Sequence, residues 1–427
     1  MKHKYTDDHH PARAIFTQPF GVSWRKALVS IPRLVPDFVL NFTSAEGPQP
    51  IVFDIPSRGK HLIPIYVWVP PLRKHHHHHP FHHRNKSSGS SHAKEPDRPT
   101  GIDENHEGKL PVLIDLHGGS FILGSCQEQA PFCSRMCREL NCVVISVDYR
   151  LGPYAQYPAA NLDAEDVVLA VTDPSNKAYT PLREGIMWAL LKDARKPVEL
   201  DDAKIAISGF SSGGNLALNL VLSVKDDPTL QTDWLSPLPW DWATDIPVLL
   251  FYPSLDARLL PDERPRPEGL DPPSSFVERW RLERELMPTY LPPEKRTHLR
   301  ASPGLADVAA PHEGERFGLH PRAKALLVLP QFDSLNSQSL LWIQKVHDQG
   351  RGADLSIEEV PGVVHGWTQF PDSWISDEHR KLKLDAFAKA RAFLHQWWHL
   401  DSSHREDDVP VEVTHDDVPI EVARDNE

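Results

Sequence analysis

The sequence predicts an α/β fold in which helices cover both faces of a mostly parallel central sheet, with a helical cap above it. Two observations support this prediction. Short aliphatic or β-branched runs recur along the chain, and helical stretches separate most of them. In addition, 41 prolines in 427 residues argue against a long-helix bundle, because each proline removes a backbone donor. In such a fold, functional sites belong at the carboxyl ends of the strands.

The predicted elements follow one another along most of the chain. We expect seven strands, at Leu62–Val69, Val112–Leu116, Val143–Tyr149, Ile205–Ser208, Val248–Tyr252, Leu326–Leu329 and Leu355–Val360. Helices are expected at Asn215–Val224, Gln338–Asp348 and Asp385–Trp397, among others. We therefore assign residues 51–400 to one large domain with two insertions, preceded by an N-terminal cap segment, residues 1–50.

The first insertion, residues 75–109, is rich in histidine. Seven of the 24 histidines fall between His75 and His83, and the stretch that follows is polar, with little to bury. Such low-complexity sequence predicts a disordered surface insertion. Because imidazole clusters bind zinc, copper or nickel, metal binding by this run is the alternative.

The second insertion, residues 254–323, is far longer than an ordinary α/β connection. Ser275 and Glu278 form a capping box, and apolar residues at helical spacing predict a helix over Ser275–Leu291. This apolar stripe is explained either by core packing or by a cap that lines a substrate pocket. In the second case the cap also includes Phe16–Phe42 of the N-terminal segment.

Charge and hydropathy exclude several classes of protein. The chain has a formal net charge of −13. Residues 401–427 contribute −8 of it, because they contain ten acidic residues and only two basic ones, Arg405 and Arg424. We predict that this tail, a tandem repeat of nine residues, is disordered. The acidic balance argues against nucleic-acid binding, and no apolar run is long enough to span a membrane. Without a signal sequence, the expected location is the cytoplasm.

The four cysteines lie within seventeen residues of one another. Cys126, Cys133, Cys137 and Cys142 lack the C-x-x-C pairs of structural zinc sites, and their spacing suits no disulfide framework. We expect buried or half-buried free thiols rather than a metal site.

A candidate nucleophile, Ser211, lies in the segment Gly209-Phe-Ser-Ser-Gly-Gly-Asn215, between a predicted strand and an apolar helix. A nucleophile on such a sharp turn needs small neighbours, which Gly209 and Gly213 provide. The helix amino terminus behind Ser211 directs amide donors toward a developing oxyanion.

A glycine pair supplies a candidate second half of that oxyanion site. Gly118 and Gly119 follow the strand Val112–Leu116, and residues without a side chain let backbone N–H groups approach a ligand. The segment precedes the serine turn in the sequence, as expected for this kind of site.

A base and an orienting acid follow at later strand ends. Asp333 comes just after one predicted strand, and His365 lies in a loop after the last one. The order Ser211, Asp333, His365 is that of α/β-hydrolases. Asp256, one strand earlier, is the alternative orienting acid.

Together these pieces resemble the hormone-sensitive-lipase-like and arylacetamide-deacetylase-like carboxylesterases, a branch of the α/β-hydrolases (α/β-hydrolase fold-3). The matching segments begin at His117, Asp148, Tyr157, Gly209, Arg300, Asp333 and His365. The resemblance implies a catalytic triad of Ser211, Asp333 and His365. It also implies an oxyanion hole formed by the amides of Gly119, Ser120 and Ser212, with Gly118 as a possible fourth member.

The sequence departs from the family pattern at several positions. Ser120 replaces the third glycine of the family motif, and Phe210 replaces the aspartate that usually precedes the nucleophile. Tyr154 replaces the glutamate that usually follows Pro153. These departures bear on substrate preference and remove no catalytic group. The candidate pocket residues are Phe210, Trp280, Met287 and Trp367.

We therefore predict a serine hydrolase that cleaves small to medium carboxylic esters through an acyl-enzyme, without a cofactor or a metal in the site. One alternative is a deacetylase, lactonase or dehydratase of secondary metabolism that uses the same site. The other is a non-catalytic ligand receptor on the same fold. A small ester is the expected partner, and the sequence does not predict the oligomeric state.

Overall fold

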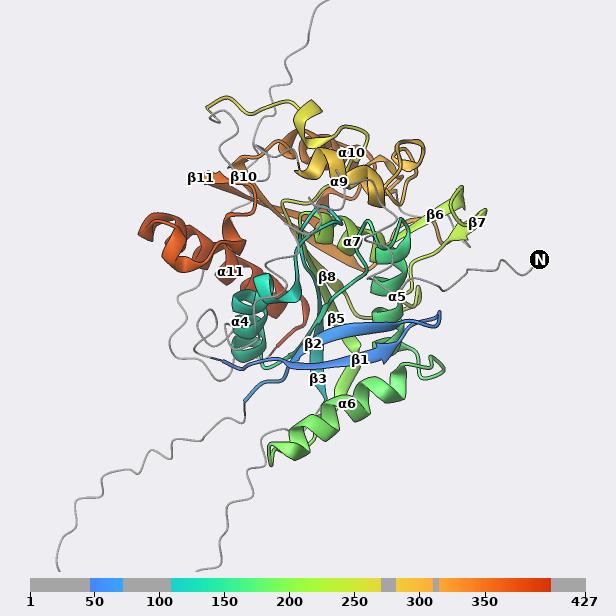
Figure 1. Ribbon diagram of the computed structural model, residues 1–427, viewed down its shortest axis with the longest axis vertical. Helices are drawn as coiled ribbons and strands as arrows, with labels where there is room; N and C mark the ends of the chain where they lie inside the picture. The colour runs from blue at the N-terminus through green and yellow to red at the C-terminus, as the bar shows by residue number, and fades with distance from the viewer. Residues whose placement is uncertain (1–46, 72–108, 270–281, 310–314, 401–427) are drawn as a thin grey trace, which may run out of the picture.

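The computed structural model describes residues 47–71, 109–269, 282–309 and 315–400 (Figure 1). An eight-stranded sheet in the order β1-β2-β4-β3-β5-β8-β10-β11 forms its centre. The first two strands pair antiparallel to their neighbours, and all later neighbours in this sheet are parallel. The strands are β1 (Ile51–Pro56), β2 (Leu62–Trp68), β3 (Leu110–Leu116), β4 (Val143–Val147), β5 (Leu200–Phe210), β8 (Ile246–Phe251), β10 (Ala323–Phe332) and β11 (Leu355–Val364).

Helices cover both faces of this sheet. They are α4 (Ala130–Leu140), α5 (Ala159–Thr172), α6 (Tyr179–Lys192), α7 (Ser212–Leu220), α9 (Leu282–Tyr290), α10 (Asn336–Asp348) and α11 (Asp377–Trp397). Apolar side chains of α5, α7 and α10 pack into one buried cluster, and those of α4 and α11 into another. In Figure 1, α4 and α11 accordingly lie to one side of the sheet and α5 to the other. This is the predicted α/β architecture, with a mostly parallel sheet between two helical layers.

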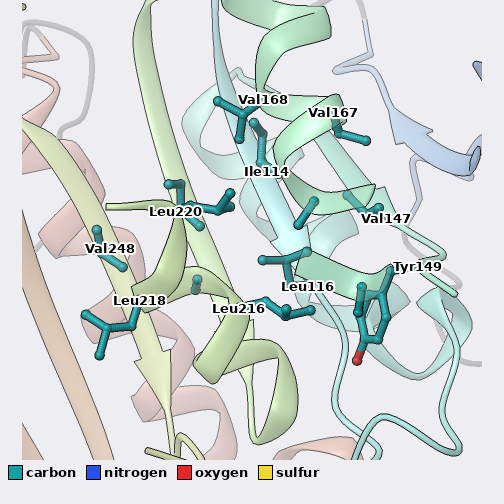
Figure 2. Close-up of a cluster of buried hydrophobic side chains, with 14 of the residues drawn as sticks. Ile114, Leu116, Val147, Tyr149, Val167, Val168, Leu216, Leu218, Leu220 and Val248 are labelled. Atoms are coloured by element: carbon teal, nitrogen blue, oxygen red, sulfur yellow. The ribbon is translucent and has the colours of Figure 1, made fainter. Parts of the chain in front are cut away.

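The central strands are buried on both faces, so their sequences are almost continuously apolar. On β3, Ile114 and Leu116 point into the cluster beneath α5 and α7, whereas Leu113 points into the cluster beneath α4 and α11. Figure 2 shows the first cluster, in which Val168 of α5 and Leu216 of α7 meet these strand residues. The alternation fixes the register of β3, and with it the position of the loop that follows.

All seven predicted strands are present, but one predicted helix is too long. The helix expected at Asn215–Val224 ends at Leu220 and is followed by strand β6 (Leu222–Asp227). This strand forms a second, three-stranded sheet with β7 (Thr232–Trp234) and β9 (Gly318–Leu319). The β9 partner is almost a hundred residues away, so a local helical pattern does not reveal the pairing.

Several expectations concern residues outside the described ranges. These include most of the N-terminal cap segment, nearly all of the histidine-rich insertion, the capping box at Ser275 and the acidic tail. The four cysteines are described, and all are buried and free, as predicted. No helix within the described ranges has both the length and the apolar character needed to cross a membrane.

Candidate active site

The predicted catalytic residues meet because four parallel strands end at one edge of the sheet. Ser211 follows β5, the Gly118-Gly119 loop follows β3, Asp333 follows β10 and His365 follows β11. Phe332 pairs with Val364 in the register of β10 and β11, so the next residues, Asp333 and His365, lie side by side.

A continuous line of hydrogen bonds joins these side chains. His365 Nδ1 lies 2.6 Å from Asp333 Oδ2, and His365 Nε2 lies 3.0 Å from Ser211 Oγ. An ionised carboxylate only accepts hydrogen bonds, so Nδ1 carries the proton and Nε2 is free to accept the Ser211 hydroxyl proton. Asp333 Oδ1 accepts the N–H of Leu335 at 2.8 Å, which fixes the buried carboxylate.

The alternative acid, Asp256, takes no part in this line. Its carboxylate pairs instead with Arg258, with 2.7 Å between Asp256 Oδ2 and the guanidinium. It lies five residues beyond the end of β8. Asp333, directly at a strand end, is the acid that contacts the imidazole.

Ser211 sits on a strained turn. Its φ of 54° lies in the left-handed region, which a side chain disfavours, and its N–H donates to Phe251 O at 2.9 Å. A Cβ on Gly209 would lie 2.1 Å from Gly213 O, and one on Gly213 would lie 2.0 Å from Leu116 O. The glycines expected from the sequence are therefore required because backbone approaches backbone at both positions.

The candidate oxyanion hole lies between this turn and the loop after β3. Among the described residues, no acceptor is present for the N–H groups of Gly118 and Gly119. The N–H of Ser212 is the first of α7 and has no acceptor within the helix. Ser120 and Phe121 both have positive φ, so the loop turns sharply after Gly119, whose own φ is 126°.

The side chain of His117 stabilises the backbone of the Gly118-Gly119 loop. This buried side chain stacks on the Tyr149 ring at 4.2 Å between centroids, and its Nδ1 hydrogen-bonds Gly118 O at 2.7 Å. The Tyr149 hydroxyl donates to His117 O at 2.7 Å. The backbone of the loop is thus held from the neighbouring strand end.

Two of the four predicted pocket residues have their side chains in the core. Phe210 and Trp367 are 0% and 1% exposed, and both belong to the apolar cluster beneath α4 and α11. Side chains alternate between the two faces along a strand, and Phe210, the last residue of β5, points to the face covered by α4 and α11. There its ring stacks on Phe251, with 4.4 Å between the ring centroids. Met287 is buried in the other core cluster, as the core-packing alternative expects, and Trp280 lies outside the described residues.

Two residues near the site were not anticipated from the sequence. Tyr252 packs its ring against His365, and the Gln369 side-chain amide lies beside Gly118. The only sequence signal for Tyr252 is its position as the last residue of a predicted strand, next to a proline. No group of three or more His, Cys, Asp or Glu side chains in the described ranges is arranged to hold a metal ion.

Comparison with known proteins agrees with this fold. The family model for the alpha/beta hydrolase fold matches residues 113–369, more than half of the chain. The esterase of Pyrobaculum calidifontis superimposes with a TM-score of 0.54 at 20% identity, over 90% of this chain and 98% of that one. The chain belongs to the alpha/beta hydrolase fold family.

Relatives within the family include enzymes named as esterases. Probable carboxylesterase 8 of Arabidopsis thaliana is 40% identical over 28% of this chain and 35% of the relative. Ethyl acetate hydrolase of Pseudomonas putida is 24% identical over 60% of this chain and 65% of the relative. These alignments thus span about a third to two thirds of the relatives' lengths.

Proposed function

We propose that this protein is a serine hydrolase of small to medium carboxylic esters. The observation that carries the proposal is the hydrogen-bonded line from Ser211 Oγ through His365 to Asp333. It lies beside backbone N–H groups that have no acceptor among the residues the structure describes. Relatives named carboxylesterase and ethyl acetate hydrolase support the same substrate class.

The first half of the reaction forms an acyl-enzyme. His365 Nε2 removes the hydroxyl proton as Ser211 Oγ attacks the ester carbonyl carbon. The N–H groups of Gly119, Ser120 and Ser212, together with that of Gly118, hold the negative oxygen of the tetrahedral intermediate. Asp333 keeps the imidazole oriented and stabilises its charged form, and the imidazolium then gives its proton to the departing alcohol.

The second half reverses these proton transfers with water. His365 removes a proton from water as the water oxygen attacks the acyl carbon. The oxyanion forms again and collapses, Ser211 recovers its proton, and the carboxylic acid leaves. Balance requires only an ester and one water molecule, which yield an acid and an alcohol.

The test is the Ser211→Ala variant with p-nitrophenyl acetate as substrate and a fluorophosphonate as covalent probe. We expect turnover to fall by roughly 10⁴- to 10⁶-fold, because removal of the nucleophile leaves only the binding contributions. Wild-type protein should bind the probe covalently, and the variant should not. Ser175→Ala, which alters an exposed serine, is the control.

Two results would contradict the proposal. Turnover retained in Ser211→Ala would place the nucleophile elsewhere. A folded wild-type protein that neither reacts with the probe nor turns over esters would favour the ligand receptor.

A further inference from the structure

We infer that Tyr252 is a positioning residue that holds the imidazole of His365 in line with Ser211 through contact between the two rings. This inference rests on the proposed function, because it assigns His365 the role of general base. It adds the residue that directly follows β8, a strand whose end supplies none of the nucleophile, the acid and the base.

The strand register places Tyr252 between the two halves of the triad. Phe210 pairs with Phe251, so Ser211 and Tyr252 are the next residues on neighbouring strands. On its other side β8 pairs with β10, the strand that leads to Asp333. Tyr252 N–H donates to Val328 O of β10 at 2.8 Å, and Phe251 O accepts Ser211 N–H at 2.9 Å.

The side chain of Tyr252 is directed at the histidine loop. Its ring centroid lies 4.9 Å from that of His365, with 67° between the planes, and 5.5 Å from that of Trp367. The phenol hydrogen-bonds Thr368 Oγ1, three residues beyond His365. The residue is completely buried, so it has no solvent to move into. One side chain therefore contacts the base and is hydrogen-bonded to the turn that carries it.

Hydrogen bonds alone do not fix the imidazole. Its two nitrogens are held by Asp333 and Ser211, and these two hydrogen bonds do not by themselves limit rotation of the ring about the line that joins them. A ring packed against it limits that tilt. About 39% of the His365 side chain is exposed, so packing from the buried side is the restraint that β8 supplies.

The backbone of Tyr252 is strained. Its φ is 39°, in the left-handed region where a β-carbon is disfavoured, yet the position carries a large aromatic residue. Strained non-glycine residues cluster at functional sites, where the surrounding structure maintains them. Burial also raises the pKa of the Tyr252 phenol, so the group stays neutral while His365 changes its charge.

The experiment distinguishes the effect of the Tyr252 ring on the reaction from the effects of its hydroxyl group and of core packing in general. Tyr252→Phe keeps the ring, Tyr252→Leu removes it, and both leave a β-carbon at the strained position. Phe387→Leu is the matched control, because Phe387 is a buried aromatic residue in the same cluster and contacts Phe132 and Phe251. For each variant, kcat and KM with p-nitrophenyl acetate, the rate of fluorophosphonate labelling and the melting temperature are measured.

We expect Tyr252→Leu to lower kcat and the labelling rate by on the order of 10- to 100-fold with KM within about threefold, as a misplaced catalytic group does. Tyr252→Phe should stay within about fivefold of wild type, because the ring remains. Phe387→Leu should lose thermal stability to a similar degree as Tyr252→Leu while keeping its kcat.

Two results would overturn the inference. One is a kcat loss in Tyr252→Leu no greater than in Phe387→Leu, and the other is an equal loss in Tyr252→Phe and Tyr252→Leu. If Tyr252→Leu does not fold, Tyr252→Met, which fills the space with a flexible chain, takes its place in the same comparison. A wild-type protein without turnover or labelling contradicts the proposed function itself, so the two failures are distinguishable.

Discussion

Glycine at position 118 shows how tightly the candidate oxyanion loop fits against the nucleophile. A β-carbon there would lie 2.7 Å from Gln369 Nε2, 3.1 Å from Phe210 O and 3.4 Å from Ser211 Cβ. The Gln369 amide nitrogen is buried and has no hydrogen-bond partner among the described residues. It therefore occupies the space next to Gly118 without being held there by a hydrogen bond.

This packing predicts that Gly118→Ala lowers kcat/KM and that a second substitution, at Gln369, restores part of the loss. The new methyl group displaces the end of the Gln369 side chain and pushes the loop away from Phe210 O, so the amide donors move. We expect kcat/KM for p-nitrophenyl acetate to fall by roughly 10- to 100-fold, as for a displaced oxyanion donor. In the double variant with Gln369→Ala, part of this loss should return, because the nearest contact is gone.

The comparison variant is Gly119→Ala, whose steric clash is with backbone atoms and cannot be removed by replacing a neighbouring side chain. Its β-carbon would lie 2.0 Å from the backbone oxygen of Leu123. Gln369→Ala should therefore not improve Gly119→Ala. A Gly118→Ala variant with wild-type kinetics would show that the loop position does not control the reaction.

At the scale of elements, the insertion between β8 and β10 is tied to the nucleophile helix by a buried arginine. Arg300 donates to Asn219 O of α7 and to Trp234 O and Leu235 O, the latter two at 3.0 and 3.2 Å. Its guanidinium lies 4.7 Å from the Trp234 ring centroid. Burial lowers the pKa of Arg300 to about 10, which leaves it charged at neutral pH.

We therefore expect Arg300→Met to destabilise the fold. The substitution leaves the buried carbonyl oxygens of Asn219 and Trp234, and the partly buried one of Leu235, without this donor. This loss should reduce the free energy of unfolding by about 3 kcal/mol. Arg258→Met is the control, since its ion pair with Asp256 is half exposed and should contribute less than about 1 kcal/mol. Urea unfolding measures both, and equal losses would contradict the role given to Arg300.

The elements that the sequence predicts well are those whose signal is local. The buried strands are runs of apolar residues, and the glycines around Ser211 report a backbone constraint, so both are readable without a structure. The strand β6 is not, because its pairing with β9 depends on residues almost a hundred positions away. The same reason explains the length predicted for the helix after Ser211.

Side-chain direction is the other limit of the sequence. Phe210 was expected in the pocket because it precedes Ser211, yet the strand turns it into the core. The sequence marks Asp256 as an alternative acid but gives no reason to single out Tyr252, four residues earlier. Only the register of β5 with β8 shows that Tyr252, the residue after β8, lies beside Ser211.

At the scale of the whole molecule, a carboxylate lies buried in the middle of the sheet. Asp115 of β3 is fully buried and accepts hydrogen bonds from Ser146 of β4 at 2.8 Å and Ser208 of β5 at 2.7 Å. Burial raises the pKa of Asp115 to about 6, against the opposing effect of these hydrogen bonds. The group thus links three strands, and it gives up its proton at a higher pH than an exposed carboxyl does.

The sign of the resulting pH dependence follows from this raised pKa. Below pH 4 the carboxyl is neutral in both folded and unfolded chains, so its contribution to stability is fully present. As the pH rises toward 6, the Asp115 carboxyl loses its proton in the unfolded chain but largely keeps it in the folded chain. The contribution is therefore lost across this window, by up to about 3 kcal/mol for a shift of roughly two pKa units.

Asp115→Asn should remove this dependence while keeping the shape of the side chain. Both serine hydroxyls can rotate to donate or accept, so the amide finds partners. Because every other group titrates alike in both proteins, the difference between their unfolding free energies isolates Asp115. From pH 5 to pH 8 the variant should gain on the order of 1 to 2 kcal/mol relative to wild type, measured by urea unfolding. A difference that stays constant with pH, or one that moves in favour of the wild type, would contradict a raised pKa for Asp115.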